Sequence, residues 1–162
     1  MITEMCVSIA NYIIKQTNTA NLTKQFSEQI PMTSKRLQKL LYFSDIEYMK
    51  NHDGKSMFED EFYAWPSGPV IPSVYYKFMK FQNGVMQPIE QNDVLIDEDV
   101  KHAIDIVLSR TGNMDTLDLV EYSHIDGGPW AHSYQCDDLD HNQIISKSAI
   151  YEFYKGRDVF SI

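Results

Sequence analysis

A cluster of residue types that bind metals or act as nucleophiles lies towards the C-terminal end of the chain. Its members are His132, Cys136, Asp137, Asp138, Asp140 and His141. On a helix, His132 and Cys136 would share a face, as two metal ligands or a Cys–His nucleophile pair would require. The spacing is irregular, however, and the chain contains no CxxC or HExxH motif. A solvated acidic loop is therefore the favoured interpretation. A metal-dependent hydrolase using His132, Cys136 and His141 is kept as an alternative hypothesis.

Three consecutive carboxylates, Glu59, Asp60 and Glu61, could supply a pair for acid–base catalysis. They precede a short β-prone segment, where negative charge commonly protects the edge of a sheet from pairing with other chains. The chain also has no GxSxG motif and no glycine-rich loop that would bind a phosphate. We therefore predict a protein that is not an enzyme and that needs no metal or cofactor.

Three basic residues, Lys35, Arg36 and Lys39, lie at the start of a predicted helix. Positive charge at a helix N-terminus opposes the macrodipole, and Lys35 and Lys39 repel each other at i, i+4 spacing. These small costs indicate that the charges have a role. Pairing with the chain's own carboxylates is the favoured interpretation, and binding of an acidic surface is the alternative.

The segment Glu61–Phe78, EFYAWPSGPVIPSVYYKF, concentrates aromatic residues and prolines. Several of its rings are suited to a core, and the prolines with Gly68 would fix the turn between a strand and a helix. Tyr75 and Tyr76 point in different directions on one helix, however, so the rings cannot all be buried. An exposed tyrosine beside a rigid proline corner is typical of protein interfaces. Stacking on nucleic-acid bases is the other use of such rings, but it needs a basic groove.

The elements that would carry these residues are mainly helices. Apolar periodicity, capping residues and helix breakers predict helices over Thr3–Gln16, from Thr33 or Ser34 to about Asn51–Gly54, from about Val70–Pro72 to Asn83–Gly84, from Asp97 to Gly112, from Asp115 to about His124, and over about Ser146–Lys155. Two short β segments, Glu61–Trp65 and Val85–Ile89, are predicted to pair with each other. The expected fold is mainly α, a compact domain of about five to six helices with one small β hairpin. Residues 1–162 are expected to form this single domain.

Composition limits the partners and the compartment. The formal charge of −9 disfavours nucleic-acid binding, which depends on a surplus of Lys and Arg, and suits a basic partner protein. No apolar run is long enough to span a membrane, so no membrane partner is expected. The N-terminus is a poor signal peptide, and two cysteines are few for a secreted scaffold. A cytoplasmic location is therefore expected.

Three segments together carry a resemblance to a known family. LQKLLYFSDIEYM (Leu37–Met49) is followed by AWPSGPVIPSVYYKF (Ala64–Phe78) and then by GGPW (Gly127–Trp130). In this order and spacing they resemble the Panacea domain family, also called SocA-like antitoxins, and the resemblance extends from about residue 5 to 155. The positions that match by motif are Leu37, Lys39, Leu40, Tyr42, Trp65, Gly68, Pro69, Val70, Tyr75, Pro129 and Trp130. Pro66 and the acidic residues after Trp130 depart from the usual pattern.

The resemblance implies a mostly helical cytoplasmic protein of bacteria or their phages that neutralises a cognate toxin by direct protein binding. It also implies delivery of the toxin to a Clp-type protease, as described for the founding member. It implies no catalytic residue, and it leaves the toxin and the oligomeric state open. The residues that we predict to contact the partner are Lys39, Tyr63, Trp65, Pro66, Gly68, Pro69, Tyr75, Tyr76 and Trp130.

A second hypothesis also fits the charge. An acidic inhibitor encoded by a phage or mobile element could mimic nucleic acid and occupy the basic channel of a nuclease. Such a mimic needs carboxylates in a phosphate-like row, whereas scattered carboxylates favour the antitoxin.

Overall fold

The structure is a computed structural model that describes residues 4–81, 84–90, 95–134 and 140–161. Its helices are α1 (Glu4–Leu22), α2 (Ser34–Lys50), α3 (Pro72–Lys77), the 3₁₀ helix η1 (Met79–Phe81), α4 (Glu98–Thr111), α5 (Thr116–Ser123), α6 (Pro129–Ser133) and α7 (Lys147–Tyr154). Its strands are β1 (Phe62–Trp65), β2 (Gly68–Val70) and β3 (Ile144–Ile145). The mainly α prediction is confirmed. None of the helices in these ranges is both long and apolar enough to cross a membrane.

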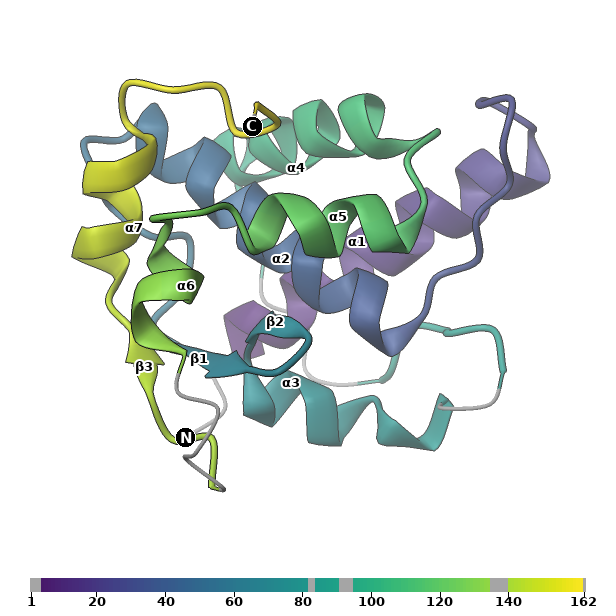
Figure 1. The fold of residues 1–162 in the computed structure, drawn as a ribbon. Coiled ribbons are helices and arrows are strands. Elements are labelled where there is room, and N and C mark those ends of the chain that lie inside the picture. Colours follow the sequence, from purple (N-terminus) through teal and green to yellow (C-terminus); the bar gives the residue numbers. More distant parts are fainter. Residues whose placement is uncertain (1–3, 82–83, 91–94, 135–139, 162) are drawn as a thin grey trace.

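Helix α2 lies at the centre of the molecule. It contacts α1, α4, α5, α7 and β2, and Figure 1 shows it passing between α4, α5 and α1. The side chain of Thr33 caps its first turn by accepting a hydrogen bond from the amide of Arg36. Every residue from Arg36 to Ile46 is buried, so this helix has no solvent face over three turns. The apolar spacing of the sequence predicts only one stripe here, the leucine stripe of Leu37, Leu40 and Leu41 continued by Tyr48.

The basic cluster is divided by this burial. Lys35 is exposed, whereas Arg36 and Lys39 point into the protein. Arg36 donates hydrogen bonds to the carbonyls of Thr111 and Met114, and Lys39 donates to a carbonyl of β2. The favoured prediction of pairing with carboxylates is therefore wrong for these two side chains. Backbone carbonyls satisfy them instead, because the carbonyls at the end of α4 and in β2 are close enough to accept.

The small sheet differs from the predicted hairpin. Strand β1 pairs antiparallel with β2, with Trp65 opposite Gly68, and it also pairs antiparallel with β3, with Phe62 opposite Ile145. The strand order is β2-β1-β3. The two-residue turn Pro66–Ser67 places β2 next to β1, so the nearer segment takes the pairing position.

The predicted partner segment, Val85–Ile89, forms no strand, so the predicted pairing is wrong. Its buried residues pack on α1 instead. The Asn11 side chain bonds both the N–H and the carbonyl of Ile89, and Asn18 donates to the carbonyl of Met86. These side chains satisfy the backbone that a strand would have paired.

Most predicted helix starts are confirmed by capping geometry. Asp97, Asp115 and Ser146 each accept a hydrogen bond from an amide in the first turn of α4, α5 and α7. Helix α1 continues past its predicted end at Gln16 to Leu22, and α3 is shorter than predicted. Helix α6, which begins at Pro129, was not predicted, because the Gly-Gly-Pro sequence was interpreted only as a helix breaker.

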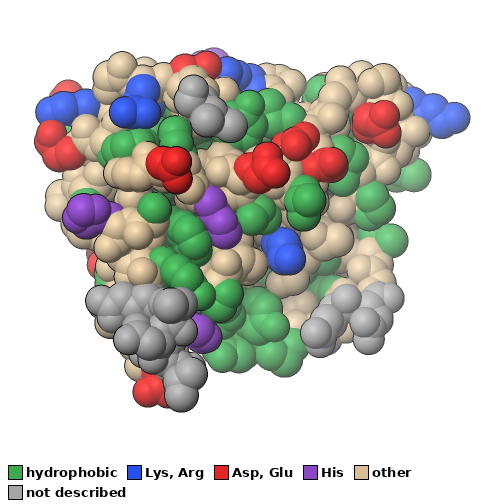
Figure 2. Space-filling model, viewed as in Figure 1, with side chains coloured by type: hydrophobic (Ala, Val, Ile, Leu, Met, Phe, Trp, Pro, Cys, Tyr) green, Lys and Arg blue, Asp and Glu red, His purple; other side chains and the backbone are tan. Residues whose placement is uncertain are grey.

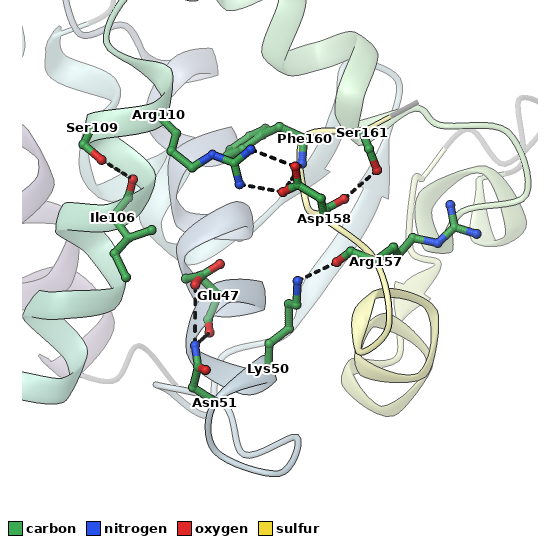
Figure 3. Close-up of polar contacts among 10 residues, drawn as sticks. All are labelled: Glu47, Lys50, Asn51, Ile106, Ser109, Arg110, Arg157, Asp158, Phe160 and Ser161. Atoms are coloured by element: carbon green, nitrogen blue, oxygen red, sulfur yellow. Dashed lines mark hydrogen bonds and ion pairs between the residues drawn. The ribbon is translucent and has the colours of Figure 1, made fainter.

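The C-terminal segment folds back onto α2 and α4. Both guanidinium NH groups of Arg110 bond the Asp158 carboxylate, which lowers the pKa of Asp158 to about 2. Lys50 at the end of α2 donates to the carbonyl of Arg157, as Figure 3 shows. Phe160 is buried against the core. We call the contacts of residues 157–161 with α2 and α4 the C-terminal clasp.

Candidate functional site

The turn after β1 and the first turns of α3 bring together a group of rings, as the sequence predicted. The ring centroid of Trp65 lies 5.3 Å from that of Tyr75 and 6.5 Å from that of Tyr76, and the two tyrosine centroids are 5.3 Å apart. Tyr76 is 61% exposed and Pro66 is exposed, whereas Trp65 and Tyr75 are half-buried. We call these four residues the aromatic corner. Figure 2 shows hydrophobic side chains gathered over α3 on this face of the molecule.

Two polar side chains of α2 hold the segment between β2 and α3. The Gln38 amide accepts a hydrogen bond from the N–H of Ile71 at 2.8 Å and donates to the carbonyl of the same residue at 3.3 Å. The Lys39 ammonium donates to the carbonyl of Pro69 at 2.7 Å. All of these groups are buried, so the bonds are shielded from competing water. The backbone on one side of the aromatic corner is therefore fixed from beneath.

A third polar side chain of α2 holds the segment on the other side. Asp45 is fully buried and accepts hydrogen bonds from the Ser56 hydroxyl at 2.7 Å and the Met57 amide at 2.8 Å. Burial raises the pKa of its carboxyl to about 6, although these hydrogen bonds and the charge of Lys147 oppose the rise. Helix α2 therefore anchors the chain both before and after the exposed residues.

Gly68 allows the close approach of β2 to α2. Its φ of +118° lies in a region that side-chain-bearing residues rarely adopt. A Cβ atom there would lie 2.7 Å from Cε of Lys39 and 2.8 Å from Oγ of Ser123. Both the backbone conformation and the space therefore require glycine, in agreement with the prediction that Gly68 fixes the turn.

Trp130 supports the aromatic corner from α6. Its indole N–H donates to the carbonyl of Trp65 at 2.8 Å. Its ring stacks on His124, with centroids 3.6 Å apart, and on Tyr134, with centroids 4.7 Å apart. Burial lowers the pKa of His124, and the charge of Lys39 lowers it further, so the imidazole in this stack is held towards its neutral form.

The predicted partner-binding residues therefore occupy two levels. Those that are buried beneath the surface are Lys39, Gly68, Pro69 and Trp130, and those that are exposed or half-buried are Tyr63, Trp65, Pro66, Tyr75 and Tyr76. The buried four lie beneath the corner, where Lys39 and Trp130 donate hydrogen bonds to the carbonyls of Pro69 and Trp65. Sequence reasoning missed Gln38 and Asp45 as anchors. Asp45 did carry a signal, because it interrupts the leucine stripe four residues after Leu41.

An open pocket of about 630 Å³ adjoins the aromatic corner. It is lined by the carboxylates of Glu59, Asp60, Glu61 and Asp140, together with His141 and Asn142. Its lining also includes Tyr63, Trp65, Tyr76, Ile71, Pro72 and Ser73. Asp60 accepts a hydrogen bond from the Ser73 hydroxyl at 3.1 Å, which holds this carboxylate against the start of α3. We call this the acidic pocket.

The candidate metal site is only partly within the described ranges. Cys136, Asp137 and Asp138 lie outside the described residues, whereas His132, Asp140 and His141 lie within them. Among the described residues, no three His, Cys, Asp or Glu side chains are grouped so that they could hold a metal ion. His132 lies on α6 and His141 beside the acidic pocket, so these two are placed on separate elements.

Comparison with known proteins identifies the family. The model of the family "Antitoxin SocA-like, Panacea domain" matches residues 37–131, which is more than half of the chain. The chain belongs to this family. It is also 34% identical over 122 residues to the protein named Antitoxin SocA from Caulobacter vibrioides. That match covers 67% of this chain and 63% of the length of the Caulobacter protein. No solved structure shows a significant match.

The residues that match the Panacea domain include both the aromatic corner and its anchors. The match begins at Leu37 on α2 and ends at Ala131 on α6, so it includes Gln38, Asp45, Gly68 and Trp130. The C-terminal clasp and α7 lie beyond the matched residues.

Proposed function

We propose that this protein is an antitoxin that neutralises a cognate toxin by binding it directly, without chemistry of its own. Membership of the SocA-like family and similarity to a named antitoxin support this proposal. The aromatic corner supports a particular binding surface for the toxin. Its exposed rings are held on a backbone that is anchored by buried polar side chains. Large rigid aromatic residues are the usual energetic centres of protein interfaces.

The face that meets the toxin, in this proposal, consists of the aromatic corner and Tyr63. The anchored backbone would lose little conformational freedom on binding, which favours affinity. Lys39, Gly68, Pro69 and Trp130 would act from beneath by keeping the corner in shape. The proposal extends to delivery of the bound toxin to a Clp-type protease, for which the family resemblance is the support.

The direct test is co-expression with the neighbouring reading frame. We expect that frame to arrest growth when expressed alone and to be tolerated when this protein is present, with the two proteins co-purifying. A neighbour that is harmless alone, or equally toxic in both cases, would contradict the proposal. The protease step is tested separately by comparing the half-life of the toxin in strains with and without the Clp protease.

A further inference from the structure

The acidic pocket has a chemical composition suited to one type of partner group. Among the described residues that line it, four are carboxylates and none is Lys or Arg. Glu59, Glu61 and Asp140 are exposed at its rim, so their charge reaches solvent. The same lining includes Tyr63, Trp65 and Tyr76. Carboxylates and aromatic rings that line the same open pocket are complementary to a cation that also has a flat face.

A histidine with an uncommon backbone conformation also lines the pocket. The Nδ1 atom of His141 is buried and has no hydrogen-bond partner among the described residues. The backbone of His141 also has a φ of +51°, a conformation that is uncommon for a residue other than glycine. Because the Nδ1 atom has almost no accessible surface, an incoming group does not reach it in this conformation. The carboxylates and the rings are therefore the groups available to a ligand.

We infer that the acidic pocket receives arginine side chains from an exposed segment of the partner protein. A guanidinium can stack on a tyrosine or tryptophan ring and donate two parallel hydrogen bonds to one carboxylate, which a lysine ammonium cannot do. The volume of about 630 Å³ lies in the range of pockets that enclose a ligand, so it is large enough for more than the tip of one side chain. This inference rests on the proposed function, because it states which chemistry of the toxin the aromatic corner meets.

The experiment uses the full-length protein and short peptides as probes. Uniformly ¹⁵N-labelled protein is titrated with acetyl-Gly-Arg-Gly-Arg-Gly-amide and with the same peptide in which citrulline replaces both arginines. Citrulline keeps the planar shape and removes the charge. We expect the arginine peptide to shift amide resonances of residues 59–65, 71–76 and 140–142, and the citrulline peptide to bind about tenfold more weakly or not at all. Equal binding of both peptides, shifts confined to other residues, or no shifts at millimolar peptide would each overturn the inference.

A matched pair of variants connects the pocket to the proposed function. The double variant E59Q/E61Q removes two charges from the pocket rim, and D118N/E121Q removes two exposed charges from α5, outside the pocket. We expect E59Q/E61Q to bind the arginine peptide about tenfold more weakly and to neutralise the toxin less well, with D118N/E121Q unchanged.

The two levels of the proposal can fail separately. If the unmodified protein neutralises the toxin and E59Q/E61Q does so equally well, the pocket inference fails and the antitoxin function stands. If the unmodified protein does not neutralise the neighbouring gene product, the function fails, and the peptide titration still decides whether the pocket binds arginine. Thermal unfolding of each variant shows whether the substitutions leave the fold intact.

Discussion

At the scale of single residues, Lys39 is the least expected member of the core. Its side chain is 0% exposed, and burial, followed by the charge of Lys35, lowers its pKa to about 7. Its hydrogen bond goes to an uncharged carbonyl, that of Pro69. A buried ammonium with such a partner costs stability whenever it is protonated. We infer that the cost is tolerated because the bond fixes the backbone of the aromatic corner.

This burial predicts a particular dependence of stability on pH. The pKa of Lys39 is about 7 in the folded protein, whereas a lysine in an unfolded, solvent-exposed chain has a pKa of 10.5. The unfolded state therefore binds more protons between these two pH values. The free energy of unfolding should therefore rise with pH in this window, by up to about 1.4 kcal/mol per pH unit. In Lys39→Met this rise should be absent. Urea titrations between about pH 7 and 8.5 measure it, with Lys15→Met, at an exposed position on α1, as the control. A slope that persists in Lys39→Met would contradict the account.

Substitution of Tyr76 is expected to weaken binding of the toxin while leaving the stability of the fold nearly unchanged. Because 61% of its surface is exposed, Tyr76→Ala should change the free energy of unfolding by less than about 1 kcal/mol. The same variant should neutralise the toxin less well, since its ring is the most exposed of the aromatic corner. Denaturant unfolding and the co-expression assay measure the two effects. If Tyr76→Ala unfolds the protein, or neutralises normally, the aromatic corner is not the docking face.

At the scale of elements, the sequence predicted the features that depend on residues close together in the chain, such as the starts of helices. The caps at Asp97, Asp115 and Ser146 begin their helices as predicted, because a side chain that accepts from the first turn acts over only three residues. The partner of β1 could not be predicted from pattern alone, since Val85–Ile89 is apolar enough for a strand but packs on Asn11 of α1. Tertiary contacts decide such cases.

In the candidate site too, features set by neighbouring residues were predicted and features set by tertiary contacts were not. The aromatic corner was recognisable from its rings and prolines, which are adjacent in sequence. Its anchors were not, because Gln38 and Asp45 meet the corner only after α2 packs beneath it, across 33 residues for Gln38 and Ile71. The long sequence separation of these contacts is the physical reason that they were missed.

The packing of β2 against α2 gives a test at Gly68. Gly68→Ala must adopt a φ near +118° and place a methyl group 2.7 Å from Lys39 Cε. We expect a loss of about 2–4 kcal/mol in the free energy of unfolding, from backbone strain and overpacking together. Gly84→Ala is the control, because a Cβ there has no atom within 4 Å. Chemical denaturation measures both variants, and equal stability for the two would show that β2 can move away from α2.

At the scale of the whole molecule, the C-terminal clasp closes the fold over α2 and α4. Arg110→Gln removes the paired hydrogen bonds to Asp158, and we expect a loss of about 1 kcal/mol or less because both groups are partly exposed. The larger effect should be local, with faster backbone motion in residues 157–161 measured by ¹⁵N relaxation. Lys155→Gln, which loses only the exposed pair with Glu152, is the control. Unchanged motion in Arg110→Gln would show that burial of Phe160 alone holds the segment.

The central position of α2 has a consequence for how the molecule opens. The amides of Met57 and Ile71 lie outside helices and strands, yet their hydrogen-bond acceptors, Asp45 and Gln38, belong to the part of α2 that is buried on every side. Breaking either bond by local fluctuation would expose a buried polar group of α2, so both protons should exchange with deuterium only when the whole chain unfolds. The loops around the rings would then be as long-lived as the core, and a protease would find no early site of attack there.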